Sequence, residues 1–238
     1  MFNIPNLFTA ANMLCGFVSI ILALFGRIDL APLFILAAVV FDFLDGFIAR
    51  KMNLQGELGK QLDSLADLVS FGVAPSLIAF QFLRLSLAQD IDGLSASWLQ
   101  LLPVFILPCA AAYRLARFNI SAPSTTGFTG VPVPAVGLLF ASFPVIYWYA
   151  PMDQAMVTAL LLNKWFWYVS VLGASFLMVS TLPMMAFKFN QVSFKKLLPL
   201  LILVAVGLVS AICFGWIAVP IVFIAYVVLS LSLKYWYL

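Results

Sequence analysis

Four aspartates occur as two closely spaced pairs in the first third of the chain. Asp42 and Asp45 are three residues apart and Asp63 and Asp67 are four apart, so each pair shares one face if its segment is helical. The chain has nine acidic residues, and five of them fall between Asp42 and Asp67. This concentration indicates chemistry that needs negative charge at one place.

Two consecutive helices joined by a short connection run antiparallel, and the two acidic faces can then meet. Four carboxylates at that spacing stay ionised only if cations neutralise them. With oxygen ligands alone, the fitting ions are Mg²⁺, Mn²⁺ or Ca²⁺, and two divalent ions would balance four carboxylates. The alternative is a set of helix-end acids paired with Arg50, Lys51 and Lys60.

The elements that must position these acids are membrane helices. Of the 238 residues, 65% are hydrophobic and 9% are charged, which excludes a soluble enzyme or a nucleic-acid-binding protein. Continuous apolar runs without alternation predict an all-α integral membrane protein, a polytopic helical bundle. The chain has no histidine, and its three cysteines lack zinc-type spacing. About eight transmembrane helices are expected, over residues 7–26, 31–51, 60–84, 97–118, 133–150, 164–187, 196–214 and 216–234.

The basic residues predict how this bundle is oriented. If both termini face the cytoplasm, nine of the twelve lysines and arginines lie at inner helix ends, and only Arg27, Arg84 and Lys164 lie outside. The acidic segment then also faces the cytoplasm. The first apolar stretch lacks a basic leader and a clear cleavage site, and we interpret it as a retained span.

Small residues and one arginine lie between the aspartates. Gly46 and Ala49 share the stripe of Asp42 and Asp45, and Gly59 lies one turn before Asp63. Small residues let a ligand come close, although they serve helix packing equally well. Arg50 follows on the same stripe, where it either clamps a phosphate or reaches to the membrane interface as an anchor.

Together these positions read Asp42-x2-Asp45-Gly46-x2-Ala49-Arg50-x8-Gly59-x3-Asp63-x3-Asp67. This pattern resembles the signature of the CDP-alcohol phosphatidyltransferases without departure. The resemblance implies a six-helix membrane core, here over residues 1–190, followed by two additional helices over 191–238. It also implies transfer of a phosphatidyl or similar group from a CDP-linked donor to an alcohol with release of CMP, and it implies a homodimer.

Family roles carry over to the matching positions. The resemblance implies that Asp42, Asp45, Asp63 and Asp67 hold Mg²⁺ or Mn²⁺, and that Asp67 is the catalytic general base. It implies that Gly46, Ala49, Arg50 and Gly59 lie along the CDP moiety. Asn6 and Thr9 would also help to bind the nucleotide, although an N-cap and a first-turn residue are natural at these positions.

Three further stretches are similar to the bacterial and archaeal phosphatidylserine synthases within this family. They are Pro5 to Thr9, Asp63 to Pro75, and Arg114 to Asn119 with Phe128 to Ala135. They imply CDP-diacylglycerol as the donor and L-serine as the acceptor. The serine carboxylate needs a cation, and Arg114, Arg117 and Asn119 at an inner helix end are the candidates, with residues 124–130 closing over the acceptor. The alternative for the two arginines is a pair of interface anchors.

Other functions stay open at this point. The same donor chemistry serves glycerol 3-phosphate or an inositol phosphate as the acceptor. Transfer can proceed by direct in-line displacement or through a phosphatidyl-enzyme intermediate. A cation-coupled transporter is an alternative of another class, since intramembrane acids also mark ion paths, but acids confined to one segment disfavour it.

Overall fold

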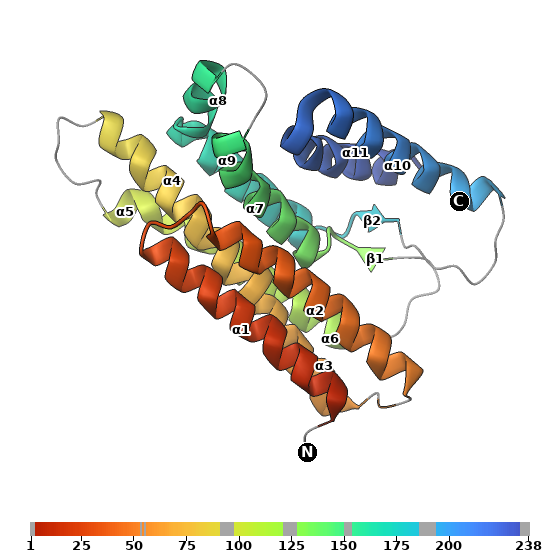
Figure 1. The fold of residues 1–238 in the computed structure, drawn as a ribbon. Helices are drawn as coiled ribbons and strands as arrows, with labels where there is room; N and C mark the ends of the chain where they lie inside the picture. Colours follow the sequence, from red (N-terminus) through yellow and green to blue (C-terminus); the bar gives the residue numbers. More distant parts are fainter. Residues whose placement is uncertain are drawn as a thin grey trace.

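The computed structural model describes residues 3–90 except 53 and 55, and residues 98–120, 128–149, 154–185 and 194–233. Helices account for nearly all of this part of the chain (Figure 1). The elements are α1 (Ile4–Leu24), α2 (Ala31–Lys51), α3 (Glu57–Asp67), η1 (Leu68–Val73), α4 (Ala74–Asp90), α5 (Trp98–Leu101), η2 (Leu102–Phe105), α6 (Ile106–Ile120), β1 (Phe128–Thr129), α7 (Val133–Tyr149), α8 (Gln154–Leu161), α9 (Lys164–Val179), β2 (Pro183–Met184), α10 (Phe194–Phe214), η3 (Gly215–Ile217) and α11 (Ala218–Leu233).

The predicted all-α membrane architecture is confirmed, and each of the eight expected segments coincides with a helix. By length and composition, five helical stretches of the described chain could cross a membrane, or six if the bent pair α8–α9 is one span. The apolar helix α7 is shorter, at 17 residues. One of the five stretches, Leu198–Ser232, contains both α10 and α11. These two helices fold back on each other after Gly215, whose φ is 58° (Figure 1).

Several boundaries and two features differ from expectation. Helix α8 was not expected, and the helical stretch expected over 60–84 runs from Glu57 to Asp90. The segment predicted over 164–187 ends as a helix at Val179, and residues Pro183–Met184 form β2 instead. β2 pairs antiparallel with β1, with Phe128 opposite Met184 and Thr129 opposite Pro183. Two residues per strand give no periodic signal, so the hydropathy pattern could not distinguish this pairing from the end of a helix.

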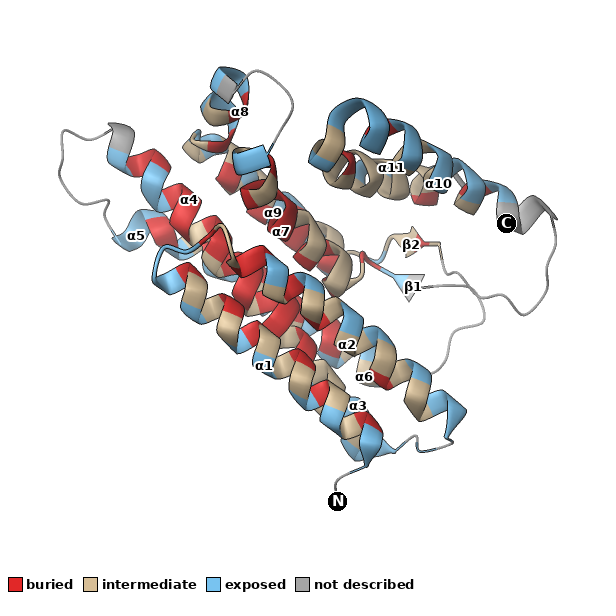
Figure 2. Cartoon of the chain, viewed as in Figure 1, coloured by how far each residue is buried: buried red, intermediate tan, exposed pale blue. Residues whose placement is uncertain are grey.

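An aromatic core holds α4, α7 and α9 together. Trp167 is fully buried and stacks on Phe82 with ring centroids 5.0 Å apart, while Phe143 meets it edge-on at 5.4 Å. Buried residues concentrate along these helices, whereas α10 and α11 are mostly half-buried or exposed (Figure 2). The most buried part of the core therefore lies among α4, α7 and α9, and α1–α2 and α10–α11 flank it.

The first three helices bring the acidic segment to one end of the bundle. α1 and α2 lie side by side, and the start of α1, the end of α2 and the start of α3 share the same end (Figure 1). The chain turns from α1 to α2 at Gly26, whose φ of 75° favours glycine. Directly after Asp67 the helix widens into the π-helical segment η1, a feature that often occurs at functional sites.

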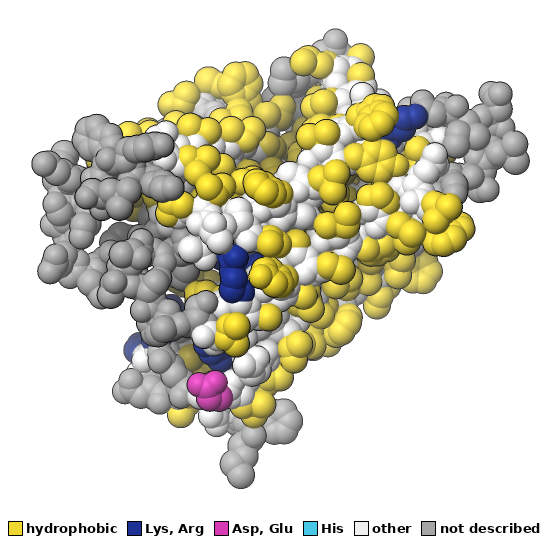
Figure 3. All heavy atoms as spheres, turned by 180° about the vertical axis from the view of Figure 1, so that it is seen from behind, with side chains coloured by type: hydrophobic (Ala, Val, Ile, Leu, Met, Phe, Trp, Pro, Cys, Tyr) yellow, Lys and Arg dark blue, Asp and Glu magenta, His cyan; other side chains and the backbone are white. Residues whose placement is uncertain are grey.

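The face opposite that of Figure 1 is covered largely by hydrophobic side chains, with few charged ones among the described residues (Figure 3). Large exposed hydrophobic residues occur on every long helix, and examples are Phe17, Leu33, Val169, Leu208 and Ile224. A surface of this kind fits hydrocarbon as its solvent.

Candidate active site

Three carboxylates from α2 and α3 form one cluster. Asp42, Asp63 and Asp67 each offer an oxygen, and these oxygens all lie within 4.8 Å of one another. Asp67 is buried, and the other two are half-buried. The two acidic faces were predicted to meet, and the structure confirms this for these three residues.

Asp45 lies beside this cluster but outside its tightest group. Its side chain is 5% exposed, and its Oδ2 accepts a hydrogen bond of 2.7 Å from Thr9 Oγ1 on α1. Asp45 lies one helical turn from Asp42 on α2. Thr9 thus orients the fourth carboxylate, and its expected contact with the nucleotide stays a prediction.

Asn12 is a residue of the site that the sequence analysis missed. It is fully buried, and its Nδ2 donates to Asp67 Oδ1 at 3.2 Å. Its own backbone carbonyl accepts a 2.9 Å hydrogen bond from Ser70 Oγ in η1. The available signal was the spacing of Thr9, Asn12, Gly16 and Ser19, which places polar and small residues on one buried stripe of an otherwise apolar helix.

The cluster fits a hard divalent cation. Its donors are carboxylate oxygens alone, and Asp63 Oδ1 is buried without a hydrogen-bond partner in the described chain. Within the described residues, no lysine or arginine forms the salt bridge with these acids that the alternative required. Lys60 Nζ donates to the Asn119 carbonyl, and the one ion pair within the described ranges joins Arg27 to Asp29 at 3.0 Å. A buried acidic cluster with an unpaired oxygen could hold a cation from outside the protein.

The residues that the sequence analysis assigned to nucleotide binding lie beside this cluster in two small groups. Asn6 Oδ1 lies 3.4 Å from where a Cβ on Gly59 would stand, which brings the start of α1 next to α3. Arg50 Nη1 lies 3.2 Å from the corresponding position on Gly46, so the guanidinium folds back over this glycine. Ala49 is half-buried on the same helix.

The three residues indicated for the acceptor have different environments. Arg114 is 8% exposed, and its Nε has no hydrogen-bond partner among the described residues. Arg117 instead donates to the carbonyls of Val179 at 2.8 Å and Ser180 at 3.1 Å. It therefore caps the end of α9, a role that sequence spacing did not reveal.

Asn119 ties α6 to the helix that carries two of the acids. Its Nδ2 donates to Ser64 Oγ at 2.8 Å and to Gln61 Oε1 at 3.3 Å, both on α3. In the segment 124–130, which we expected to close over the acceptor, residues 124–127 lie outside the described residues.

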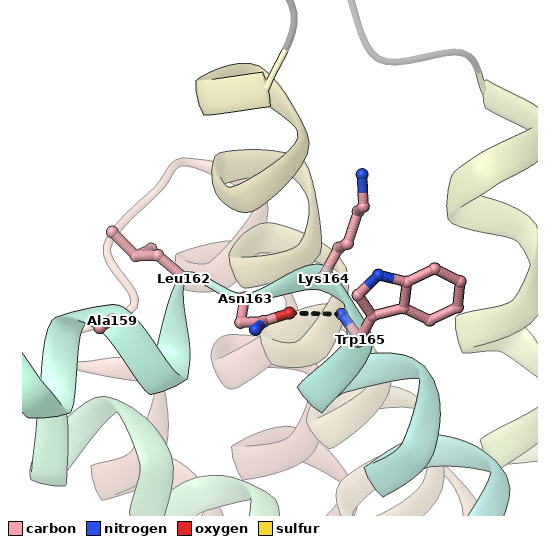
Figure 4. A pocket seen from close by; sticks show the side chains of 5 residues that line it. All are labelled: Ala159, Leu162, Asn163, Lys164 and Trp165. Carbon is pink, nitrogen blue, oxygen red and sulfur yellow. Dashed lines mark hydrogen bonds between the residues drawn. The ribbon is translucent and has the colours of Figure 1, made fainter.

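A hollow at the bend between α8 and α9 is a separate feature. It is lined by Ala159, Leu162, Asn163, Lys164 and Trp165 (Figure 4). Asn163 uses its side-chain oxygen to cap α9 by accepting a 2.9 Å hydrogen bond from Trp165 N. The hollow has no carboxylate and lies toward the opposite end of the bundle from α3 (Figure 1), so it does not belong to the acidic site.

Comparisons with known proteins agree with this geometry. The model of the CDP-alcohol phosphatidyltransferase family matches residues 2–167. The CDP-diacylglycerol–serine O-phosphatidyltransferase of Bacillus subtilis is 36% identical over 193 residues, which cover 78% of this chain and 91% of the relative. The archaetidylserine synthase of Methanothermobacter thermautotrophicus is 32% identical over 157 residues, covering 65% and 63%. A Helicobacter pylori CDP-diacylglycerol–serine O-phosphatidyltransferase is 37% identical over 141 residues, covering 58% and 56%. The match spans less than two thirds of the last two relatives.

Proposed function

The chain belongs to the CDP-alcohol phosphatidyltransferase family, and we propose that it transfers the phosphatidyl group of CDP-diacylglycerol to the hydroxyl of L-serine. The products are phosphatidylserine and CMP. The observation that carries the chemistry is the group of three carboxylates from α2 and α3 with one unpaired buried oxygen. The names of the relatives support serine as the acceptor, as do the serine-type stretches of the sequence.

We propose that Asp42, Asp63 and Asp67 hold divalent cations, with Asp45 completing the set. Divalent ions there would supply charge neutralisation for the donor pyrophosphate and the departing CMP. Arg50, at the edge of the acidic stripe, contacts the donor phosphates through its planar fork. Asn6, Gly46, Ala49 and Gly59 border the nucleotide.

Asp67 accepts the proton of the serine hydroxyl in this proposal. The serine oxygen forms a bond to the phosphorus that carries diacylglycerol, and the bond from that phosphorus to the oxygen of CMP breaks. Asn12 Nδ2 donates to Asp67 Oδ1 at 3.2 Å and so orients this carboxylate. General-base assistance of this kind contributes roughly 10²- to 10⁴-fold to a rate.

A single in-line displacement is the form of transfer that we propose. The alternative, a phosphatidyl-enzyme intermediate, needs a nucleophile, and the cluster offers only carboxylates. Chirally labelled CDP-diacylglycerol distinguishes the two routes. We expect inversion of configuration at phosphorus, whereas retention would establish two successive displacements.

Arg114 is the residue that we propose for the serine carboxylate. It is buried, and its Nε has no hydrogen-bond partner in the described chain. Arg117 fits this role less well because it donates to Val179 and Ser180. We expect Arg114→Lys to raise the KM for serine at least tenfold, since losing a hydrogen-bonded charge contact costs about 1.5–3 kcal/mol. An unchanged KM would remove Arg114 from the acceptor site.

The membrane arrangement that we propose places both termini and the acidic cluster on the cytoplasmic side of the inner membrane. The donor then keeps its acyl chains in lipid and its nucleotide at the aqueous face. Residues 1–190 form the family core and 191–238 an added hairpin, and the protein acts as a homodimer, as the family resemblance implies.

Purified protein with CDP-diacylglycerol and a panel of alcohols tests the acceptor. The panel contains L-serine, glycerol 3-phosphate and inositol phosphate, and the lipid formed is identified by mass spectrometry. We expect a serine lipid and equimolar CMP. A product from glycerol 3-phosphate or inositol phosphate alone would keep the family chemistry and reject serine. Ion transport without CMP release would favour the transporter alternative.

A further inference from the structure

The end of α6 lies against the helix that carries two of the acids, and one asparagine joins the two helices. Asn119 Nδ2 donates to Ser64 Oγ at 2.8 Å and to Gln61 Oε1 at 3.3 Å, both on α3. The Asn119 backbone carbonyl accepts a 2.8 Å hydrogen bond from Lys60 Nζ, also on α3. Three hydrogen bonds thus connect a single residue of α6 to about one turn of α3.

These contacts support one another. Ser64 Oγ, which accepts a hydrogen bond from Asn119, itself donates to the Lys60 carbonyl at 3.1 Å. The Asn119 carbonyl belongs to the last turn of α6, which ends at Ile120, and carbonyls there have no partner within their own helix. A lysine ammonium satisfies such a carbonyl and interacts favourably with the helix dipole. Asn119 is therefore fixed to α3 both by its side chain and by its backbone.

A second contact between α6 and the same acidic segment lies farther along both helices. A Cβ on Gly72 of η1 would stand 3.1 Å from Ala111 Cβ on α6. Ser64 and Gly72 are eight residues apart, and so are Asn119 and Ala111, so the two segments run antiparallel in register. Asp67 lies between the two contacts. The helix α6 thus supports the acidic segment on either side of Asp67.

The acids of α3 need such support because they repel the acid of α2. Oxygens of Asp42, Asp63 and Asp67 lie within 4.8 Å of one another, and ionised carboxylates at this separation push their helices apart. Apolar packing holds α3 only weakly, since two of its eleven residues are buried, Ala66 and Asp67 itself. Polar contacts with the neighbouring helices must therefore keep α3 in place.

We propose that Asn119 is a positioning residue that holds α3 against α6 and thereby keeps Asp63 and Asp67 within reach of Asp42. Asn119 then contributes to cation binding without being a ligand. The inference rests on the proposed function, in which these carboxylates hold divalent cations. It gives Asn119 a different task from the acceptor contact that the family resemblance implies, and the two tasks differ in what a variant loses.

Mn²⁺ binding to the purified Asn119→Ala protein, measured by electron paramagnetic resonance, tests this inference. Alanine removes the amide that donates to Ser64 and Gln61. We expect the Kd for Mn²⁺ to rise about three- to tenfold, as for the loss of one or two hydrogen bonds. At saturating Mn²⁺, the KM for serine should stay within twofold of the wild-type value.

Ser64→Ala approaches the same contact from α3, because it removes the hydroxyl that Asn119 meets. We expect the Kd for Mn²⁺ to rise in the same direction. The double variant should show no further rise beyond the larger single effect, since the two residues act through one contact. An asparagine that only touched the acceptor would show no such coupling to Ser64.

Asn163→Ala is the matched control, because Asn163 also has a structural hydrogen bond but lies toward the opposite end of the bundle (Figure 1). It caps α9 by accepting a 2.9 Å hydrogen bond from Trp165 N. We expect a lower melting temperature with an unchanged Kd for Mn²⁺, which separates a general loss of stability from a displaced α3.

An unchanged Kd for Mn²⁺ in both Asn119→Ala and Ser64→Ala would overturn the inference. A raised KM for serine with an unchanged Kd for Mn²⁺ would also overturn it, and would make Asn119 an acceptor contact. Asn119 Oδ1, which is buried without a hydrogen-bond partner among the described residues, would then be the atom that meets the acceptor. Wild-type protein that binds no Mn²⁺ would instead overturn the cation site of the proposed function.

Discussion

Asp42, Asp63 and Asp67 place three carboxylate oxygens within 4.8 Å of one another inside helices long and apolar enough to cross a membrane. Ionised groups at this separation repel each other strongly where little water screens them. The unpartnered Asp63 Oδ1 shows that the protein itself does not satisfy this charge within its described part. The divalent cation that we propose would remove both the repulsion and the missing contact.

The Asp63→Asn variant tests the proposed cation site at the level of one residue. The amide keeps the volume but removes the charge and one strong ligand, so we expect activity to fall about 10³-fold, within the range for losing a catalytic group. Mn²⁺ binding measured by electron paramagnetic resonance should weaken in parallel. Glu57→Gln is the matched control, because Glu57 begins the same helix and is exposed. Retention of more than a tenth of the wild-type activity in Asp63→Asn would contradict the assignment.

A separate prediction concerns Asn12, because its side chain on α1 donates a hydrogen bond to Asp67. Asn12→Ala leaves the acids in place but frees the Asp67 side chain. We expect kcat to fall about 10- to 100-fold, as for groups that orient a ligand, with a similar loss of Mn²⁺ affinity. The melting temperature in detergent shows whether the fold is retained. Wild-type kcat in this variant would show that Asp67 needs no support from α1.

At the level of elements, the close approach of α1 to η1 sets the position of the site. Gly16 lies against Ser70, and a Cβ on Gly16 would stand 2.5 Å from Ser70 Oγ and 2.8 Å from Ser70 Cα. Ser70 also bonds to the Asn12 carbonyl. The π-helical segment that begins after Asp67 therefore docks on α1 at the level of the residue that holds Asp67.

Gly16→Ala is expected to separate these two elements. Because backbone atoms block the added methyl group, α1 must shift, and we expect a lower melting temperature together with at least a tenfold loss of activity. Gly173→Ala on α9 is the control, since open space surrounds that position. Relief of the glycine's conformational entropy there is worth about 0.5–1 kcal/mol, so the control should be unchanged or slightly stabilised. Equal melting temperatures and activities of the two variants would show that neither stability nor activity depends on the close approach of α1 to η1.

The sequence predicts the helices well because continuous apolar runs and a scarcity of charge leave few alternatives in lipid. It predicts the cluster of Asp42, Asp63 and Asp67 because helical spacing and a short connection force the two faces together. It does not reveal Asn12, since one amide in an apolar helix has no partner until tertiary packing supplies one. The β1–β2 pairing and the cap that Arg117 forms on α9 are equally invisible, because both join segments distant in the chain.

For the whole molecule, the largely apolar surface and the uneven distribution of basic residues decide how it lies in the bilayer. Single cysteines introduced into a cysteine-free protein test this orientation with a membrane-impermeant maleimide. We expect Glu57→Cys to react only when the cytoplasmic side is accessible and Asp29→Cys only from the opposite side, since excess lysine and arginine stay inside. The reverse pattern would place the acidic cluster outside and contradict the proposed access of the nucleotide.

The most direct test of the central claim is phosphatidyl transfer by purified protein stripped of metal with a chelator. With CDP-diacylglycerol and L-serine, we expect no CMP release until Mg²⁺ or Mn²⁺ is restored, and then serine lipid and CMP in equal amounts. The Asp63→Asn protein should not recover at the same metal concentration. Full activity in the metal-free wild-type protein would contradict the assignment of Asp42, Asp63 and Asp67 as a cation site.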